Sequence, residues 1–467
     1  MNLNKLIAQP FTVAYDNSID PLIPENWANE GLAILEENMV VANLVYRDFD
    51  KDVAKYGQIV HTRRPGELKG YRKTSADSVS VQDVTATDVE VRLDQWLHCS
   101  FNIKDGEETY SFKDLITMYL RPGMLGIART VDRCILATYA QFLSNYAGGL
   151  GQLTGSNARD YILDTRGVMN VNKAYEEDRK LILGSISETT MLKTDLFTAA
   201  EKMGDGGNAL RTARLGNKLG FETHLSQNMA SITVGNTVKT GAVNLSAGYA
   251  AGTTNMTVDG FVGAVATGSW MTVGGDDTPL RISGHGETSS NTTYILVQGG
   301  LKRAVANDAV IKAYTPGAVN NSGGYASGYA KYITVSGFSV APQIGQMVSF
   351  TTSPTSAVYV IVDVVGSTSI MLDRALESAI SDTDAVNIGP AGSYNLAFHP
   401  NAIALVNRPL VQPRSGAGAL SAVMDYNGVA LRCTIQYQGS SQGHLVTLDT
   451  LFGVKVLDTG LGAVLLG

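Results

Sequence analysis

Cysteine is scarce in this chain of 467 residues, and its three cysteines, Cys99, Cys134 and Cys433, lie far apart. They form neither a CxxC pair nor a Cys/His cluster, which argues against a zinc site and against a disulfide framework. We therefore expect reduced, buried thiols, which are typical of a protein that folds in a cytosol.

Charged residues and long apolar runs are also few. The chain carries 36 basic and 43 acidic side chains, a formal net charge of -7, and no basic block. A protein that grips nucleic acid by its phosphates is expected to be basic, so this composition argues against that role. It is compatible with a wall that encloses DNA without binding it. No stretch reaches the roughly 18 apolar residues of a membrane-spanning helix, and the first residues lack the apolar core of a signal peptide.

Catalytic and cofactor motifs are missing as well. The sequence contains no HExxH, GxSxG or Walker A pattern. The glycine-rich run 148–155 follows a predicted helix and has Thr154 where a dinucleotide loop needs its last glycine, and the turn 204–208 lacks the spaced carboxylates of a calcium site. The six histidines have no carboxylate or cysteine at a useful local spacing. We expect no catalytic, cofactor or metal site, although a site built from residues distant in the chain stays open.

A strong helical period is present between residues 111 and 149. From 124 to 146 the apolar residues recur at i, i+3, i+4 and i+7, while Asp132 falls on the opposite, polar face. Pro122 suits the first turn of a helix, and Gly148 with its neighbour Gly149 suits the end. The spacing predicts a long central helix with one buried stripe. An ordinary core helix of an unrelated enzyme would fit the same periodicity.

The region before this helix is expected to hold an arm, a helix and a long hairpin. Residues 1–55 are predicted to form an irregular arm and a helix that runs from Pro24 to Tyr46. Residues 56–110 alternate in two long strands, the second continuing to Ile103, with a polar tip between them. A hairpin this long needs a partner, either another subunit or a second domain of the same chain.

The region after the helix changes character twice. Residues 111–231 contain the helix and an α+β portion, with a short helix predicted at 193–203. Residues 232–392 are rich in Gly, Ser, Thr and Val and contain an internal repeat, in which 256–261 matches 333–338. The repeat predicts two tandem β-modules of four or five strands, at about 250–315 and 330–390, joined by a linker at 315–329. A single irregular β-domain is the alternative. Residues 393–467 are predicted to be rich in β-strands.

The order of these parts resembles the major capsid (coat) protein of tailed bacteriophages, which has the HK97-like fold. It is most similar to coat proteins of short-tailed phages that carry an inserted β-domain, although the duplication of the insert departs from that pattern. The segments that carry the resemblance are 56–60, 64–65, 121–124, 215–216, 220–221, 402–409, 431–437 and 451–454.

The resemblance implies an α+β fold with an extended hairpin loop, a spine helix, inserted all-β modules, and a C-terminal segment that completes the body. It implies a structural, non-enzymatic subunit that assembles into pentamers and hexamers and encloses double-stranded DNA. Expected partners are further copies of the chain, a scaffolding protein and a portal, with no cofactor and no membrane. The expected location is the virion capsid, assembled in the host cytoplasm.

Two further expectations concern surfaces. The cationic cluster on the hairpin and one tryptophan beyond it are candidate assembly contacts, although a solvated loop tip would also explain the cluster. These residues are Arg63, Arg64, Lys69, Arg72, Lys73 and Trp96. The alternative function is a β-rich virion surface protein or adhesin whose repeats bind carbohydrate, and an enzyme with a dispersed site is a third hypothesis.

Overall fold

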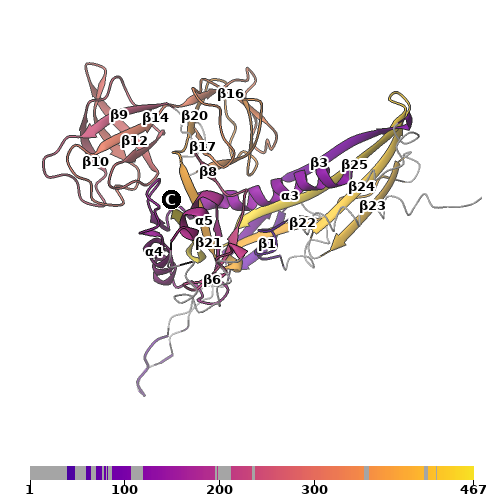
Figure 1. Cartoon of the computed structure of the whole chain (residues 1–467), viewed down its shortest axis with the longest axis horizontal. Helices are drawn as coiled ribbons and strands as arrows, with labels where there is room; N and C mark the ends of the chain where they lie inside the picture. Colours follow the sequence, from indigo (N-terminus) through magenta and orange to yellow (C-terminus); the bar gives the residue numbers. More distant parts are fainter. Residues whose placement is uncertain are drawn as a thin grey trace, which may run out of the picture.

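A computed structural model of the chain places most of its residues, and the account below concerns these alone. The described residues are 39–47, 59–64, 70–75, 78–79, 81, 87–106, 119–194, 197, 212–233, 237–351, 357–414, 419–426 and 429–467. They contain few helices and many strands, which confirms the predicted mixture. An elongated body extends to one side, and two small barrels lie next to each other above its other end (Figure 1). The predicted arm at 1–38, the turn 204–208 and most of the helix at 193–203 fall outside the described residues.

The central helix exists but is shorter than the periodicity predicts. The α-helix α3 (Arg121–Leu136) begins with Pro122 in its first turn and tightens into a 3-10 segment, η3 (Ala137–Phe142). The chain then enters a strand, β4 (Tyr146–Gly148), which pairs in parallel with β26 (Gly462–Leu466). Helical periodicity therefore overshoots by several residues, because the backbone groups at 146–148 bond to a sheet instead. The predicted stripe is buried: Met124, Ile127, Ala128, Val131, Cys134, Ile135, Tyr139 and Phe142 are all at most 5% exposed.

One residue of the polar face is misplaced by the sequence argument. Asp132 is only 1% exposed. Its carboxylate accepts hydrogen bonds from the backbone N–H groups of Val40 and Ala42, at 3.2 and 3.3 Å. Residues 39–47 form turns and a β-bridge rather than the predicted end of a helix, and Tyr46 pairs with Ala404. The helix prediction is therefore wrong for these residues.

The hairpin is also shorter than expected. Strands β1 (Ile59–Arg64) and β2 (Thr87–Arg92) pair antiparallel over their whole length. The second strand does not continue within the hairpin. The chain turns at residues 93–94 and enters β3 (Gln95–Lys104), which pairs with β25 (Gly443–Val456) in another sheet. Alternation persists through the turn, so a period of two could not reveal the change of partner.

A long antiparallel sheet forms the extended side of the body. Its strand order is β22 (Ile403–Arg408), β25, β24 (Val429–Gln438) and β23 (Ala419–Tyr426), with β3 on the other edge of β25. The helix α3 runs along this sheet (Figure 1). The approach is close at Gly123, where an added Cβ would lie 2.8 Å from the Cys99 sulfur. The apolar side chains of the sheet that face α3 form one core with its stripe.

A second sheet occupies the other part of the body. Its order is β4, β26, β21 (Gly392–Phe398), β5 (Lys180–Leu183), β7 (Phe221–Leu225) and β6 (Asn217–Lys218), and β8 (Ser231–Ile232) pairs with β21. The helices α4 (Ala158–Val171) and α5 (Ser185–Leu192) belong to the same region. The strand β26 lies between β4 and β21, and all five of its residues are buried.

The insert consists of two closed six-stranded barrels, named here barrel 1 and barrel 2. The strands of barrel 1 are β9 (Val238–Val243), β10 (Asn255–Asp259), β11 (Trp270–Val273), β12 (Leu280–Thr288), β13 (Asn291–Val297) and β14 (Val310–Tyr314). Those of barrel 2 are β15 (Gly317–Val319), β16 (Ile333–Ser336), β17 (Met347–Phe350), β18 (Tyr359–Val365), β19 (Ser369–Leu372) and β20 (Ala385–Ile388).

The limits of the barrels differ from the prediction. Barrel 1 begins at Val238, before residue 250, and β15 lies inside the stretch that was expected to be a linker. Both first strands contain a glycine, Gly241 and Gly317, where a Cβ would collide with a phenylalanine ring of the same barrel. Gly317 was assigned to the linker from composition, although it allows a phenylalanine ring to pack against a strand, as Gly241 does in barrel 1.

Candidate assembly surface

Along β3, β24 and the part of β25 between them, the face of the long sheet that points away from α3 is polar and is called here the outer face. At the β22 end of the sheet the same side is apolar and is covered by β2, through Val91, Leu93, Ala404 and Val406. Antiparallel pairing places His98, Asp449 and Arg432 in one row across β3, β25 and β24, and Ser100, Thr447 and Thr434 in the next. Residues directly opposite each other share a face. The hydroxyl groups of Ser100 and Thr447 are 3.0 Å apart.

Trp96 projects from this outer face and is held in place there. Its side chain is 59% exposed, while the indole N–H donates to Asp449 Oδ2 at 3.3 Å. Asp449 is 3% exposed and accepts two hydrogen bonds from the Arg432 guanidinium, one of them from Nε at 2.9 Å. Arg432 also donates to the Val411 carbonyl at 2.6 Å. A large exposed ring with a fixed orientation loses little freedom on contact with a partner.

The other predicted contact residues are distributed differently. Arg63 and Arg64 lie on β1, opposite Asp88 and Thr87. Arg72 and Lys73 are exposed in the segment 70–75. Lys69 lies outside the described residues. Trp96 belongs to the long sheet and β1 to a separate two-stranded sheet, so Arg63 and Arg64 do not share a strand surface with Trp96.

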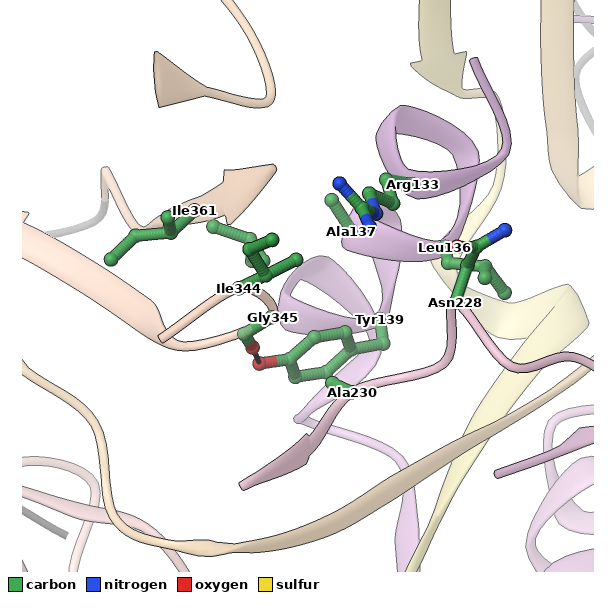
Figure 2. A pocket seen from close by; sticks show the side chains of 10 residues that line it. Arg133, Leu136, Ala137, Tyr139, Asn228, Ala230, Ile344, Gly345 and Ile361 are labelled. Carbon is green, nitrogen blue, oxygen red and sulfur yellow. Dashed lines mark hydrogen bonds between the residues drawn. The ribbon is translucent and has the colours of Figure 1, made fainter. Parts of the chain in front are cut away.

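Barrel 2 is attached to α3, to η3 and to the chain after β2. The Tyr139 hydroxyl donates to the Gly345 carbonyl at 2.7 Å across a small pocket (Figure 2). Arg133, above it on α3, donates to the Val362 carbonyl at 3.3 Å. Asp94 accepts the N–H of Ala375 at 2.8 Å.

The same pocket has little chemistry to offer. Its other lining residues are Leu136, Ala137, Asn228, Ala230, Ile344, Val360 and Ile361. Arg133 is the one charged side chain that lines it, and no carboxylate, histidine or cysteine does. Burial lowers the pKa of Arg133 while the charge of Asp363 opposes that shift. The pocket is therefore a packing junction between the spine and barrel 2.

Barrel 1 is attached to the chain that follows α3 and η3, at the end of β4 and in the loop after it. The N–H of Leu150 donates to the Asp277 carbonyl at 2.8 Å. Arg303 donates to the Gly148 carbonyl at 2.7 Å. Barrel 1 also contacts barrel 2, because Arg281 donates to the Ser349 hydroxyl at 3.0 Å. Both barrels are thus tied to the stretch that runs from α3 to the loop after β4.

The arrangement nearest to a catalytic triad lies on barrel 1. His285 Nε2 is 2.9 Å from Glu287 Oε1, and its Nδ1 is 3.4 Å from the Thr267 hydroxyl. Residues i and i+2 of a strand share a face, so a histidine can meet a carboxylate at this spacing. His224 and Glu222 repeat the geometry at 3.3 Å. The expectation that no histidine has a local carboxylate is therefore wrong.

These pairs do not amount to an active site. Thr267 and Glu287 are both exposed, so nothing at this position excludes water from a reacting group. Within the described ranges, no group of three His, Cys, Asp or Glu side chains has the geometry to hold a metal ion. The three cysteines are free, and burial raises the pKa of Cys433 to about 12. A thiol with that pKa stays protonated and unreactive at neutral pH.

Comparisons with known proteins gave matches among solved structures. No family model and no curated protein matches the chain. A chain from Mycobacterium phage Che8 is similar over 91% of this chain and 90% of its own, with 14% identity and a TM-score of 0.44. A chain of the capsid structure of cyanophage P-SCSP1u is similar over 89% and 84%, with 11% identity and a TM-score of 0.43. For the mature capsid of bacteriophage PhiM1 the shares are 89% and 83%, with 9% identity and a TM-score of 0.39.

Of the helices in the described ranges, none combines the length and the apolarity that crossing a bilayer requires.

The residues that hold the Trp96 side chain in place, Asp449 and Arg432, were not predicted from the sequence. Asp449 and Arg432 stand in predicted strands, at positions that carry opposite charges. Charges of opposite sign in two neighbouring strands are a usable signal only when the register of the strands is known. The register in turn depends on the pairing of β3 with β25, residues far apart in the chain.

Proposed function

We propose that this protein is a structural subunit of the capsid of a tailed bacteriophage and has no enzymatic activity. The observation that carries the proposal is the shape of the body: a long helix covers one face of a long sheet, and the other face is polar along β3, β25 and β24 and is covered by β2 at its β22 end. Such a plate presents a broad surface to neighbours and buries no reaction site. Large contacts between copies are what a closed shell requires.

In this proposal the parts have the roles of an HK97-like subunit. The segment α3–η3 is the spine, and the hairpin of β1 and β2 is part of the extended hairpin loop, which ends before β3 rather than at residue 110. Residues 1–55 hold the N-terminal arm. Residues 111–231 comprise the spine and peripheral domain, and residues 393–467 complete the body. Residues 232–392 are an insert of two modules on the outer surface, where an element with its own core displaces no neighbour.

The partners follow from the same proposal. Copies assemble into pentamers and hexamers around double-stranded DNA, with a scaffolding protein and a portal as further components of the virion. The net charge of -7 suits a wall that does not hold the DNA by its phosphates. The assembly contacts are Arg63, Arg64, Lys69, Arg72, Lys73 and Trp96, all of which this proposal places at subunit boundaries.

Electron microscopy and sedimentation of the purified chain test the proposal. We expect closed shells, or rings of five and six subunits, when the chain is expressed alone or with its neighbouring genes. A monomer that never assembles under either condition would overturn it.

A variant sharpens the same experiment. Trp96→Ala should weaken each subunit contact by about 2 kcal/mol, as expected for a central aromatic anchor, and so suppress particle formation. The matched control is Tyr294→Ala, which removes another exposed aromatic, 42% exposed, from barrel 1. Equal particle yields for the two variants would contradict the role of Trp96 while leaving assembly itself intact.

A further inference from the structure

Residues 39–47, named here the strap, cross the body beside the spine. Met39, Val41, Ala42 and Val45 are buried, at most 7% exposed, and pack into the core that α3 builds. The N–H of Leu44 donates to the Val41 carbonyl at 2.9 Å and closes a turn. This turn directs successive backbone N–H groups toward α3.

The receiving group is Asp132, which is buried and comes from the middle of the spine. Its two carboxylate oxygens accept the N–H groups of Val40 and Ala42, at 3.2 and 3.3 Å. Both oxygens of this carboxyl group are therefore engaged by the strap. Arg47, at the end of the strap, donates to the Ala42 carbonyl at 2.5 Å and brings a positive charge near the carboxylate.

A second attachment has no titratable group. The N–H of Tyr46 donates to the Ile403 carbonyl, and the N–H of Leu405 donates to the Tyr46 carbonyl, both at 3.0 Å. These bonds pair the strap with β22 as a short parallel bridge. The strap therefore has one attachment that depends on a carboxyl group and one made by backbone alone.

We propose that Asp132 docks the strap onto the spine in a proton-linked manner, so that the docked strap is held more tightly when Asp132 takes up a proton. The inference does not depend on the proposed capsid function. It concerns one segment of the chain and one buried side chain.

The sign follows from the surroundings of the carboxyl group. Burial raises the pKa of Asp132 from 3.8 to about 6, although the N–H groups of the strap and the charge of Arg47 act to lower it. On its own helix the neighbouring cations are Arg129, which is exposed, and Arg133, which is directed to barrel 2. When the strap detaches, water reaches the carboxyl group and its pKa returns toward the ordinary value of about 3.9.

The docked state consequently binds a proton more tightly than the undocked state. Linkage then requires that docking strengthen as the pH falls through 6, reach its maximum below about 4, and stay at its minimum above about 7. Between pH 7.5 and pH 4.5 the docking equilibrium should shift by about 25-fold. A protonated carboxyl keeps its carbonyl oxygen and can still accept an N–H group.

Hydrogen exchange of the Val40 and Ala42 amides in the full chain tests the proposal. After correction for intrinsic exchange rates, protection of these two amides should be about 25-fold higher at pH 4.5 than at pH 7.5. Asp132→Asn keeps an acceptor without a titratable charge, so its protection should not vary with pH. Asp132→Ala removes the acceptor and should lose protection at both pH values. The matched control is Asp164→Asn on the exposed face of α4, which should behave as the wild type.

Each outcome bears on the proposal. Protection that is flat or falls on acidification in the wild type would refute the proton linkage. Retained protection in a folded Asp132→Ala variant would show that other contacts dock the strap. If Asp132→Ala does not fold by circular dichroism, the comparison of Asp132→Asn with the wild type decides. Neither measurement requires particle formation, so a failure here is distinguishable from a failure of the capsid proposal.

Discussion

Barrels 1 and 2 have the same strand order, and each has its own apolar interior. They differ in the side chains that point outward from strands β11–β12 and β17–β18. The pair Met271–Leu280 in barrel 1 corresponds to Val348–Tyr359 in barrel 2, and all four side chains face their own barrel core. The adjacent pairs point outward. They are Trp270–Arg281 in barrel 1 and Met347–Val360 in barrel 2.

The outward pairs explain where each barrel lies. Met347 and Val360 are apolar and join the core that α3 builds, to which Trp270 of barrel 1 also belongs. Arg281 lies over the Trp270 ring, 5.4 Å from its centroid, and donates to Ser349 on the wall of barrel 2. Barrel 1 thus contacts barrel 2 through a polar outward pair, in addition to its bonds with the loop after β4, and barrel 2 contacts α3 through an apolar one. The inward positions of the two barrels are alike, and the outward positions differ in polarity.

The largest expected effect comes from exchanging the outward residues. Val360→Arg places a charge in the apolar junction with the spine and should lower the free energy of unfolding by more than about 4 kcal/mol. Arg281→Val in barrel 1 removes the hydrogen bond to Ser349 and the contact with Trp270, and should cost about 1 kcal/mol. Urea unfolding measures both. Similar losses for the two variants would contradict the assignment of different roles to the two walls.

Two equivalent glycines provide a smaller and better matched test. Gly268 and Gly345 both have a positive φ, 86° and 88°, and each N–H donates to a strand carbonyl at 2.7 Å. A Cβ on Gly345 would lie 2.8 Å from the Ala230 Cβ, whereas on Gly268 the nearest atom would be the amide nitrogen of Asn387 at 3.5 Å.

Both alanine variants should carry the left-handed backbone cost of about 1–2 kcal/mol, and Gly345→Ala should lose about 1–3 kcal/mol more through overpacking. Thermal unfolding of the two variants checks the difference. Equal destabilisation would mean that the packing around Gly345 accommodates a methyl group as easily as the packing around Gly268, between the two barrels, and would contradict the prediction.

The smallest effects concern individual hydrogen bonds between each barrel and the body. Tyr139→Phe leaves the Gly345 carbonyl without its donor in a buried junction and should cost about 1–2 kcal/mol. Arg303→Met removes the half-buried donor to Gly148 and should cost about 0.5–1 kcal/mol. Urea midpoints of the two variants give the comparison. A larger loss for Arg303→Met would reverse the order of importance of the two attachments.

The sequence was informative where local periodicity and local packing agree. The buried stripe of α3, the first-turn position of Pro122 and the alternation of β25 all follow from side-chain spacing. The repeat was visible because both barrels need the same interior residues. The strand pairings define the equivalent positions: Met271, opposite Leu280 in barrel 1, corresponds to Val348, opposite Tyr359 in barrel 2.

The rest depends on contacts between distant parts of the chain. Asp132 has the spacing of an exposed residue and is buried because a strap 90 residues earlier in the chain covers it. The predicted long hairpin ends at residues 93–94 because β3 pairs with β25, which lies more than 300 residues later in the chain. Trp96 and Asp449, which share a hydrogen bond, are separated by 353 positions in the sequence. Local patterns cannot encode such partners, and the candidate outer face was therefore anticipated only through Trp96.

The position of β26 determines when the second sheet of the body can be completed during folding. This strand separates β4 from β21, so the sheet cannot close until residues 462–466 have left the ribosome. The barrels, whose strands are close in sequence, can form much earlier during synthesis. β4 must then wait while more than 300 further residues are translated before its partner exists. The body of a newly made chain therefore stays incomplete until residues 462–466 have been made, even where the barrels have already formed.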